Sequence, residues 1–152
     1  MSIVARLEFD VLRPERELAA LLEQAGGDGA VVSFVGLARP SSSDGRSVEQ
    51  LILDHHPALT QQSLEEIAVA AGERFAVSHA RIVHRCGTIA AGEPIVFAGA
   101  AARHRRAAFE CADYLMDRLK TEAVFWKREV SESGAEWIEP TDADYADRER
   151  WS

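Results

Sequence analysis

The chain is poor in cysteine and has no long apolar run, and both absences narrow the classes of protein to which it can belong. Its two cysteines, Cys86 and Cys111, lie far apart and form no CxxC pair, so we expect buried free thiols and a cytoplasmic protein. No apolar segment approaches the roughly 20 residues that span a bilayer. The N-terminus has no basic stretch followed by an apolar one, so we expect neither a signal peptide nor a membrane protein.

Positive charge is also scarce. The chain has 17 Lys and Arg residues against 25 Asp and Glu, which gives a formal net charge of -8. This balance argues against a general affinity for nucleic acid or for anionic membranes. Any basic site must therefore be local. No spacing among the histidines and cysteines is typical of a metal site, and we expect no bound metal.

The periodicity of apolar residues predicts one domain over residues 1–152, with the element order β-α-β-β-α-β-β-α-β-β. Strands are expected at 2–10, 29–37, 48–56, 79–87 and 94–102. Helices are expected from Pro14 to Gly26, from Pro57 to Phe75, and over 104–120. The segments "VFWKREVS" and "EWIEP" predict a closing hairpin, the segment 40–47 a mobile polar loop, and 141–152 a polar tail for which a helix is one of the alternatives. This order predicts an α+β fold with helices packed on a mostly antiparallel sheet.

Basic residues gather where cations are least favoured. Arg103, His104, Arg105 and Arg106 stand at the predicted start of the helix 104–120, which is the positive end of its dipole. No Ser, Thr, Asp or Asn is present to cap the first backbone N–H groups. Free amides and guanidinium groups together predict an anion site, with phosphate as the commonest ligand. The alternative is a solvated cluster that pairs with acidic residues from elsewhere in the fold.

Two lysines flank the apolar segment "AVFW". Lys120 stands in the last turn of the predicted helix, where a cation complements the dipole. Lys127 falls in a strand whose alternation places it on the same face as Phe125 and Glu129. Partial burial and neighbouring arginines would both lower the pKa of Lys127, as a catalytic base or nucleophile near neutral pH requires.

The remaining candidates are weaker. Arg39 follows a strand at the mouth of the polar loop and is able to contact a phosphate, although a loop arginine is by default a surface residue. His55, His56 and His84 lie at strand ends or within strands. Each is interpreted as a structural histidine whose polar atoms are satisfied inside the fold.

Several segments together resemble one known family. They are "DGAVVSFVGLAR" (28–39), "LILDHHPALT" (51–60), "IVHRCGTIAAGE" (82–93), "HRRAAFECADYLMDRLKTEAVFWKRE" (104–129) and Trp137. In this order they resemble the catalytic (large) subunit of molybdopterin synthase. The resemblance covers nearly the whole chain from residue 28 onward, and its most specific part is the Asp-x-Leu-Lys helix end followed by Trp-Lys-x-Glu.

The resemblance implies a fold, an activity and partners. The fold would be of the α/β hammerhead type. The activity would be conversion of cyclic pyranopterin monophosphate (precursor Z) to molybdopterin by installing two sulfurs as a dithiolene. The sulfur would come from the C-terminal thiocarboxylate of a small ubiquitin-like subunit ending in Gly-Gly. The family assembles as a heterotetramer around a dimer of catalytic subunits and needs no cofactor.

The resemblance also implies which residues form the site. Lys120 and Lys127 correspond to the family's essential lysines, and Lys120 is favoured as the residue closest to the chemistry, although the division of roles stays open. The matching substrate-binding positions are Leu37, Ala38, Arg39, His104, Arg105, Lys120, Lys127, Arg128 and Glu129. Leu37 replaces a lysine and Pro40 an asparagine that are common in the family, so the contact at Leu37 is in doubt. The alternative function is a regulatory module that binds a phosphorylated ligand without catalysis.

Overall fold

The structure, a computed structural model, describes all of residues 1–152. Its strands are β1 (Ser2–Glu8), β2 (Ala30–Leu37), β3 (Gln50–His55), β4 (Val77–Arg85), β5 (Gly87–Ala90), β6 (Pro94–Ala102), β7 (Phe125–Ser131) and β8 (Gly134–Ile138). Its helices are α1 (Pro14–Ala25), α2 (Leu59–Arg74), α3 (Arg105–Glu122) and α4 (Asp142–Glu149). No helix has the combination of length and apolar character needed to cross a membrane.

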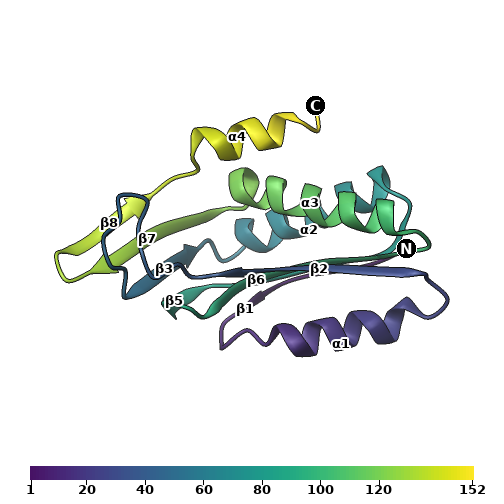
Figure 1. The fold of residues 1–152 in the computed structure, drawn as a ribbon, viewed down its shortest axis with the longest axis horizontal. Coiled ribbons are helices and arrows are strands. Elements are labelled where there is room, and N and C mark those ends of the chain that lie inside the picture. Colours follow the sequence, from purple (N-terminus) through teal and green to yellow (C-terminus); the bar gives the residue numbers. More distant parts are fainter.

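The strands form two four-stranded sheets. The first sheet has the order β1-β4-β6-β2, in which only the β1–β4 pair is parallel. The second has the order β5-β3-β7-β8 and is antiparallel throughout. Helices α2 and α3 cover one face of the first sheet and α1 covers the other, while the β7–β8 hairpin extends away at one end (Figure 1).

Strand β6 forms the centre of the core because both of its faces are buried. Ala98 and Ala100 face α2 and α3, and their small side chains let these helices approach the sheet. Phe97 and Ala101 point the other way and pack against α1. A Cβ on Gly99 would lie 2.8 Å from a methyl group of Leu21, so glycine permits the close approach of α1. Alternation along one strand thus builds both hydrophobic layers.

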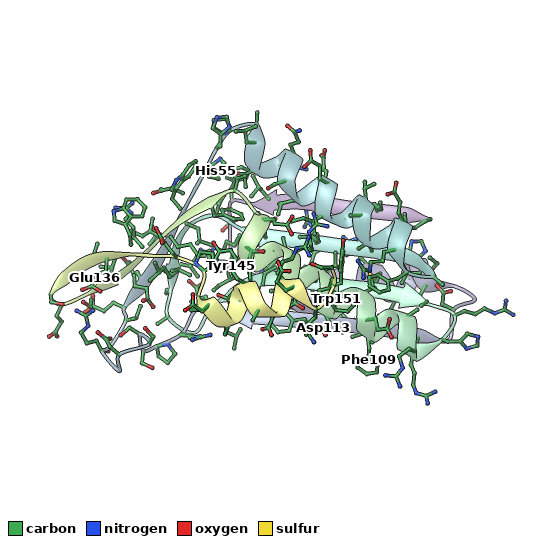
Figure 2. The ribbon with its side chains drawn as sticks, turned by 90° about the horizontal axis from the view of Figure 1, so that it is seen from above. His55, Phe109, Asp113, Glu136, Tyr145 and Trp151 are labelled. Atoms are coloured by element: carbon green, nitrogen blue, oxygen red, sulfur yellow. The ribbon has the colours of Figure 1, made fainter.

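The C-terminal segment folds back over α3. Thr141 and Asp144 form a capping box that starts α4. Beyond α4, the indole N–H of Trp151 donates to Asp117 Oδ2 at 2.7 Å, and its ring meets Phe75 and Tyr114 edge-on. Figure 2 shows the end of α4 and Trp151 lying over α3. The polar tail predicted from the sequence is therefore an ordered cover on this helix.

The predicted α+β class is confirmed, with three differences. The predicted single sheet is two sheets. The segment expected as a turn before β6 contains β5, which exists because Leu51 of β3 pairs with Ile89. The polar loop is closed by a bridge between Ser41 and Ser47, and its Arg46 reaches Glu136 of the hairpin at 2.5 Å.

Candidate active site

A pocket of about 240 Å³ opens where the C-terminal end of α3 meets β7 and the end of β2. Its cations are Arg39, Lys120 and Lys127, and its acids are Glu129, Glu139 and Asp144. The three cations form no ion pair anywhere in the chain. Lys120 and Lys127 are also the only two lysines of the sequence. Unpaired cations in a concave site favour an anionic ligand.

The chain segment between the two lysines is held by α2. Thr60 Oγ1 donates to the carbonyl of Val124 at 2.5 Å, and the Val124 N–H donates to Ser63 Oγ at 3.1 Å. Thr60 and Ser63 are both buried, so these hydrogen bonds are protected from water. They set the angle at which α3 passes into β7. The two ammonium groups therefore converge because α2 positions the backbone between them.

Burial changes the acid–base behaviour of Lys127. Its side chain lies among the apolar residues of the pocket, and loss of solvation lowers its pKa to about 8. The positive charge of Lys120 lowers this pKa further, and Asp144 raises it by a smaller amount. Of the two causes predicted to lower this pKa, burial is confirmed, whereas neighbouring arginines are wrong, because the neighbouring cation is Lys120. At neutral pH a useful fraction of Lys127 is a free amine.

His84 also lines the pocket, which the sequence analysis did not foresee. Its imidazole is 5% exposed and stacks on Phe125 with ring centroids 4.3 Å apart. Its Nδ1–H donates to the carbonyl of Arg85 at 2.9 Å. Burial, and then the charges of Lys127 and Lys120, lower its pKa to about 3, so the ring is neutral. The only signal in the sequence was its place on the strand face that carries Ala80 and Ile82.

Five of the predicted residues lie around or just outside the pocket. Leu37, Arg39 and Glu129 line it, whereas Ala38 is buried beneath, with its N–H donating to the carbonyl of Glu93 at 2.8 Å. Arg128 lies on the opposite face of β7, as strand alternation requires. There it stacks over the ring of Trp137 at 5.2 Å and reaches Asp54 at 3.3 Å. The structure thus places Arg128 away from this pocket.

His104 and Arg105 do not meet the lysines within one chain. They stand at the start of α3, and about 15 residues of helix at 1.5 Å each separate Arg105 from Lys120 by roughly 22 Å. In Figure 1, α3 runs from the right-hand end of the molecule, where it starts, to near the middle, where β7 begins. As the sequence predicted, this helix start has no side-chain cap and no acidic residue in its first turn. It forms a second cationic surface, distinct from the pocket of its own chain.

The fold and the pocket define an α+β domain of two sheets that presents unpaired lysines to an anionic ligand. The sequence profile of the MoaE protein family matches residues 7–122. The molybdopterin synthase catalytic subunit of Pseudomonas aeruginosa is 44% identical over 146 residues, covering 96% of this chain and 97% of the relative. The protein of the same name from Caulobacter vibrioides is 50% identical over 123 residues, covering 81% and 80%.

A solved structure agrees with the sequence comparisons. The molybdopterin biosynthesis MoaE protein from Burkholderia ambifaria superposes with a TM-score of 0.79 at 36% identity, covering 99% of this chain and 97% of that one. The chain belongs to the MoaE family, whose relatives named above are catalytic subunits of molybdopterin synthase.

Proposed function

We propose that this chain is the catalytic subunit of a molybdopterin synthase. It transfers sulfur to cyclic pyranopterin monophosphate from the thiocarboxylated C-terminus of a small ubiquitin-like partner subunit, and so builds the dithiolene of molybdopterin. The observation that carries the proposal is the meeting of the only two lysines in one pocket without ion-pair partners. The names of the relatives support the same activity.

The charges of the pocket suit both reactants. The cyclic phosphate and the thiocarboxylate are anions, and Arg39, Lys120 and Lys127 are free to pair with them. Fixed ammonium groups also stabilise the negative charge that develops as sulfur adds and the cyclic phosphate opens. The lowered pKa of Lys127 favours it as the proton acceptor. Lys120 is then the electrostatic partner, and Glu129 and Leu37 help to shape the substrate site.

A dimer would bring His104 and Arg105 to this pocket. Strand β2 is an edge strand with exposed apolar side chains at Phe34, Val35 and Leu37, features that favour pairing with another strand. The residue just before β2 lies against the segment that leads into α3, since a Cβ on Gly29 would stand 2.5 Å from the carbonyl oxygen of Arg103. The last residues of β2 enter the pocket.

A two-fold axis through the middle of β2 would therefore place the start of β2 in one copy beside the end of β2 in the other. The unpaired His104 and Arg105 of one copy would then face Arg39 and Lys120 of the other. Such a dimer accounts for the uncapped basic start of α3 as a phosphate-binding element. With one small sulfur-carrying subunit on each copy, the assembly is a heterotetramer. Both cysteines are free and buried, which suits a reducing compartment such as the cytoplasm.

The test of the function is a sulfur-transfer assay with precursor Z and the thiocarboxylated partner. The expected result is formation of the dithiolene product by the wild-type chain. Absence of product with an active partner would reject the proposal. Tight binding of the phosphorylated pterin without turnover would instead favour the regulatory module.

A further inference from the structure

The guanidinium group of Arg85, the last residue of β4, is buried but does not line the pocket. Its Nη2 donates to the carbonyl of Thr88 at 3.2 Å, and its Nη1 lies 3.3 Å from Glu93 Oε1. These are its only polar contacts, because Nε and Nη1 make no hydrogen bond. Glu8, its neighbour on β1, pairs with Arg6 instead. A buried cation depends strongly on its one ionic partner, so the Arg85–Glu93 ion pair fixes the segment that carries Glu93.

Glu93 closes a tight turn over residues 90–93. Its Oε1 also accepts the N–H of Ala90 at 2.8 Å, and its own N–H donates to the carbonyl of Ala90 at 3.0 Å. Gly92 supplies the positive φ of 88° that this turn requires. The hydrogen bond from Ala90 and the charge of Arg85 lower the pKa of Glu93, so its carboxylate is charged at neutral pH. One carboxylate thus joins the end of β4 to the turn.

This turn holds the chain at the end of β2. The carbonyl of Glu93 accepts the N–H of Ala38 at 2.8 Å, and the N–H of Gly92 donates to the carbonyl of Ala38 at 2.7 Å. Leu37, the last residue of β2, is paired with Pro94, which has no N–H to donate. Beyond Leu37 the backbone is therefore held through the turn. Ala38 is 1% exposed, so water does not compete for these hydrogen bonds.

Arg39 follows Ala38 directly, and its exposed side chain lines the pocket. That side chain forms no ion pair. Its direction therefore depends on the backbone that carries it. On one side of Arg39, the carbonyl of Pro40 accepts the N–H of Val48 at 2.9 Å. On the other side stand the two hydrogen bonds between Ala38 and the turn, so a shift of the turn reaches Arg39 through a single residue.

We propose that the Arg85–Glu93 ion pair positions Arg39. The ion pair fixes the turn 90–93, and the turn fixes the backbone on which Arg39 stands. The guanidinium group of Arg39 is thereby directed at the phosphate of the substrate. A binding group is held most precisely where buried contacts behind it order its backbone. The inference rests on the proposed function, in which Arg39 contacts that phosphate.

Arg81 offers a matched control on the same strand. It stands four residues before Arg85, its side chain is nearly as buried, and it pairs with Glu17 at 2.8 Å. That pair joins α1 to the sheet and includes no residue of the pocket wall or of the turn. Arg81→Gln should therefore destabilise the fold and leave the direction of Arg39 unchanged.

The first experiment measures hydrogen exchange of single amides by NMR in the full-length chain. Glu93→Gln removes the charge but keeps an amide oxygen that accepts the Ala90 N–H. We expect the N–H groups of Ala38 and Gly92 to exchange about tenfold faster than in the wild type, and those of β6 to stay unchanged. Unchanged exchange at Ala38 and Gly92 overturns the proposal. Equal acceleration throughout β6 also overturns it, because it would report a general loss of stability.

The second experiment is a double-mutant cycle on the affinity for precursor Z, measured by calorimetry without the partner subunit. Arg85→Gln should weaken binding about tenfold where Arg39 is present and should have no further effect in Arg39→Ala. Equal losses in the two backgrounds overturn the proposal, as does an equal loss in Arg81→Gln. The side chain of Glu93 is 33% exposed, so Glu93→Gln takes the place of Arg85→Gln in the cycle if the latter does not fold.

Failure of the proposed function is seen separately from failure of the ion pair. Hydrogen exchange needs neither precursor Z nor sulfur transfer, so it tests the link between the ion pair and Ala38 by itself. A wild-type chain that does not bind precursor Z would reject the proposed function and the role of Arg39 together. A wild-type chain that binds it and forms product, with no coupling between Arg85 and Arg39, would reject this inference alone.

Discussion

The cations on the two faces of the first sheet are placed in opposite ways. On the face covered by α1, the nearly buried Glu17 binds Arg6 at 2.7 Å and Arg81 at 2.8 Å. Burial alone would raise the pKa of Glu17, but hydrogen bonds from the two arginines outweigh it and lower that pKa. On the face covered by α3, Lys120, Lys127 and Arg39 share a pocket with no ion pair.

The contrast separates charge that holds the fold together from charge kept available for a ligand. Glu17 joins α1 to β1 and β4, and its charge is fully matched inside the chain. Lys127 is largely buried and has no ion-pair partner. Its lowered pKa shows that burying the charged amine costs free energy. A cost of this kind persists in a folded protein where function requires it. The α1 side should therefore govern stability, and the α3 side should govern activity.

The largest expected effect is on sulfur transfer. Lys120→Ala and Lys127→Ala should each reduce kcat by at least about 100-fold, because each removes a charge or a proton acceptor from the reacting centre. Glu17→Gln should retain near-normal kcat in protein that is still folded. The measurement is single-turnover formation of the dithiolene from precursor Z. Near-normal turnover in both lysine variants would show that these residues have been wrongly assigned.

The second expected effect tests whether the pocket is shared between copies. Lys120→Ala and Arg105→Ala should each be nearly inactive alone. After mixing and subunit exchange, half of the dimers contain one of each, and one of the two pockets in such a dimer has both residues intact. About a quarter of all sites should thus recover. Activity no greater than the sum of the separate variants would place Arg105 outside the pocket.

Much of this arrangement could be predicted from local pattern. Alternation along β7 correctly placed Lys127 and Glu129 on the strand face opposite to Trp126. The sequence also showed that His104, at the start of α3, is not a capping residue. These features depend on neighbours within a few residues, where strand and helix geometry decide.

The features that the sequence analysis did not predict depend on contacts between residues far apart in the chain. Strand β5 has four residues and no periodicity of its own, and it forms only because β3 lies beside it. His84 carries no local sign that it lines the pocket, because its place there is set by the contact of β4 with Phe125. The predicted site with both Lys120 and Arg105 stays a prediction, because α3 separates the two residues within one chain. Both ends of a helix reach one site only if a second copy supplies one of them.

A third effect concerns stability on the α1 side. Glu17→Gln leaves Arg6 and Arg81 without their shared carboxylate, and we expect a loss of about 2 kcal/mol in the free energy of unfolding. Urea titration at neutral pH measures it. The control is Glu136→Gln on the exposed hairpin, whose ion pair with Arg46 lies in solvent and should contribute nothing measurable. A loss in the control as large as in Glu17→Gln would contradict the distinction between matched buried charge and surface charge.

The smallest effect has the opposite sign and belongs to the pocket. The pKa of Lys127 is lower in the folded chain, about 8, than the 10.5 of a free lysine, so the unfolded chain holds the extra proton between these values. Folding is therefore penalised below about pH 8, and the penalty disappears as pH rises toward 10.5. Lys127→Met should raise the free energy of unfolding by about 2 kcal/mol at pH 7.

Comparison with the wild type at pH 10 completes the test, since the advantage of Lys127→Met should shrink there as the wild-type penalty is relieved. Lys120 is exposed, so Lys120→Met should change the free energy of unfolding little at either pH. If Lys127→Met were instead destabilising at pH 7, the amine would have a partner within the fold. The pocket would then be as well matched as the cluster at Glu17, and its cations would not be held free for a ligand.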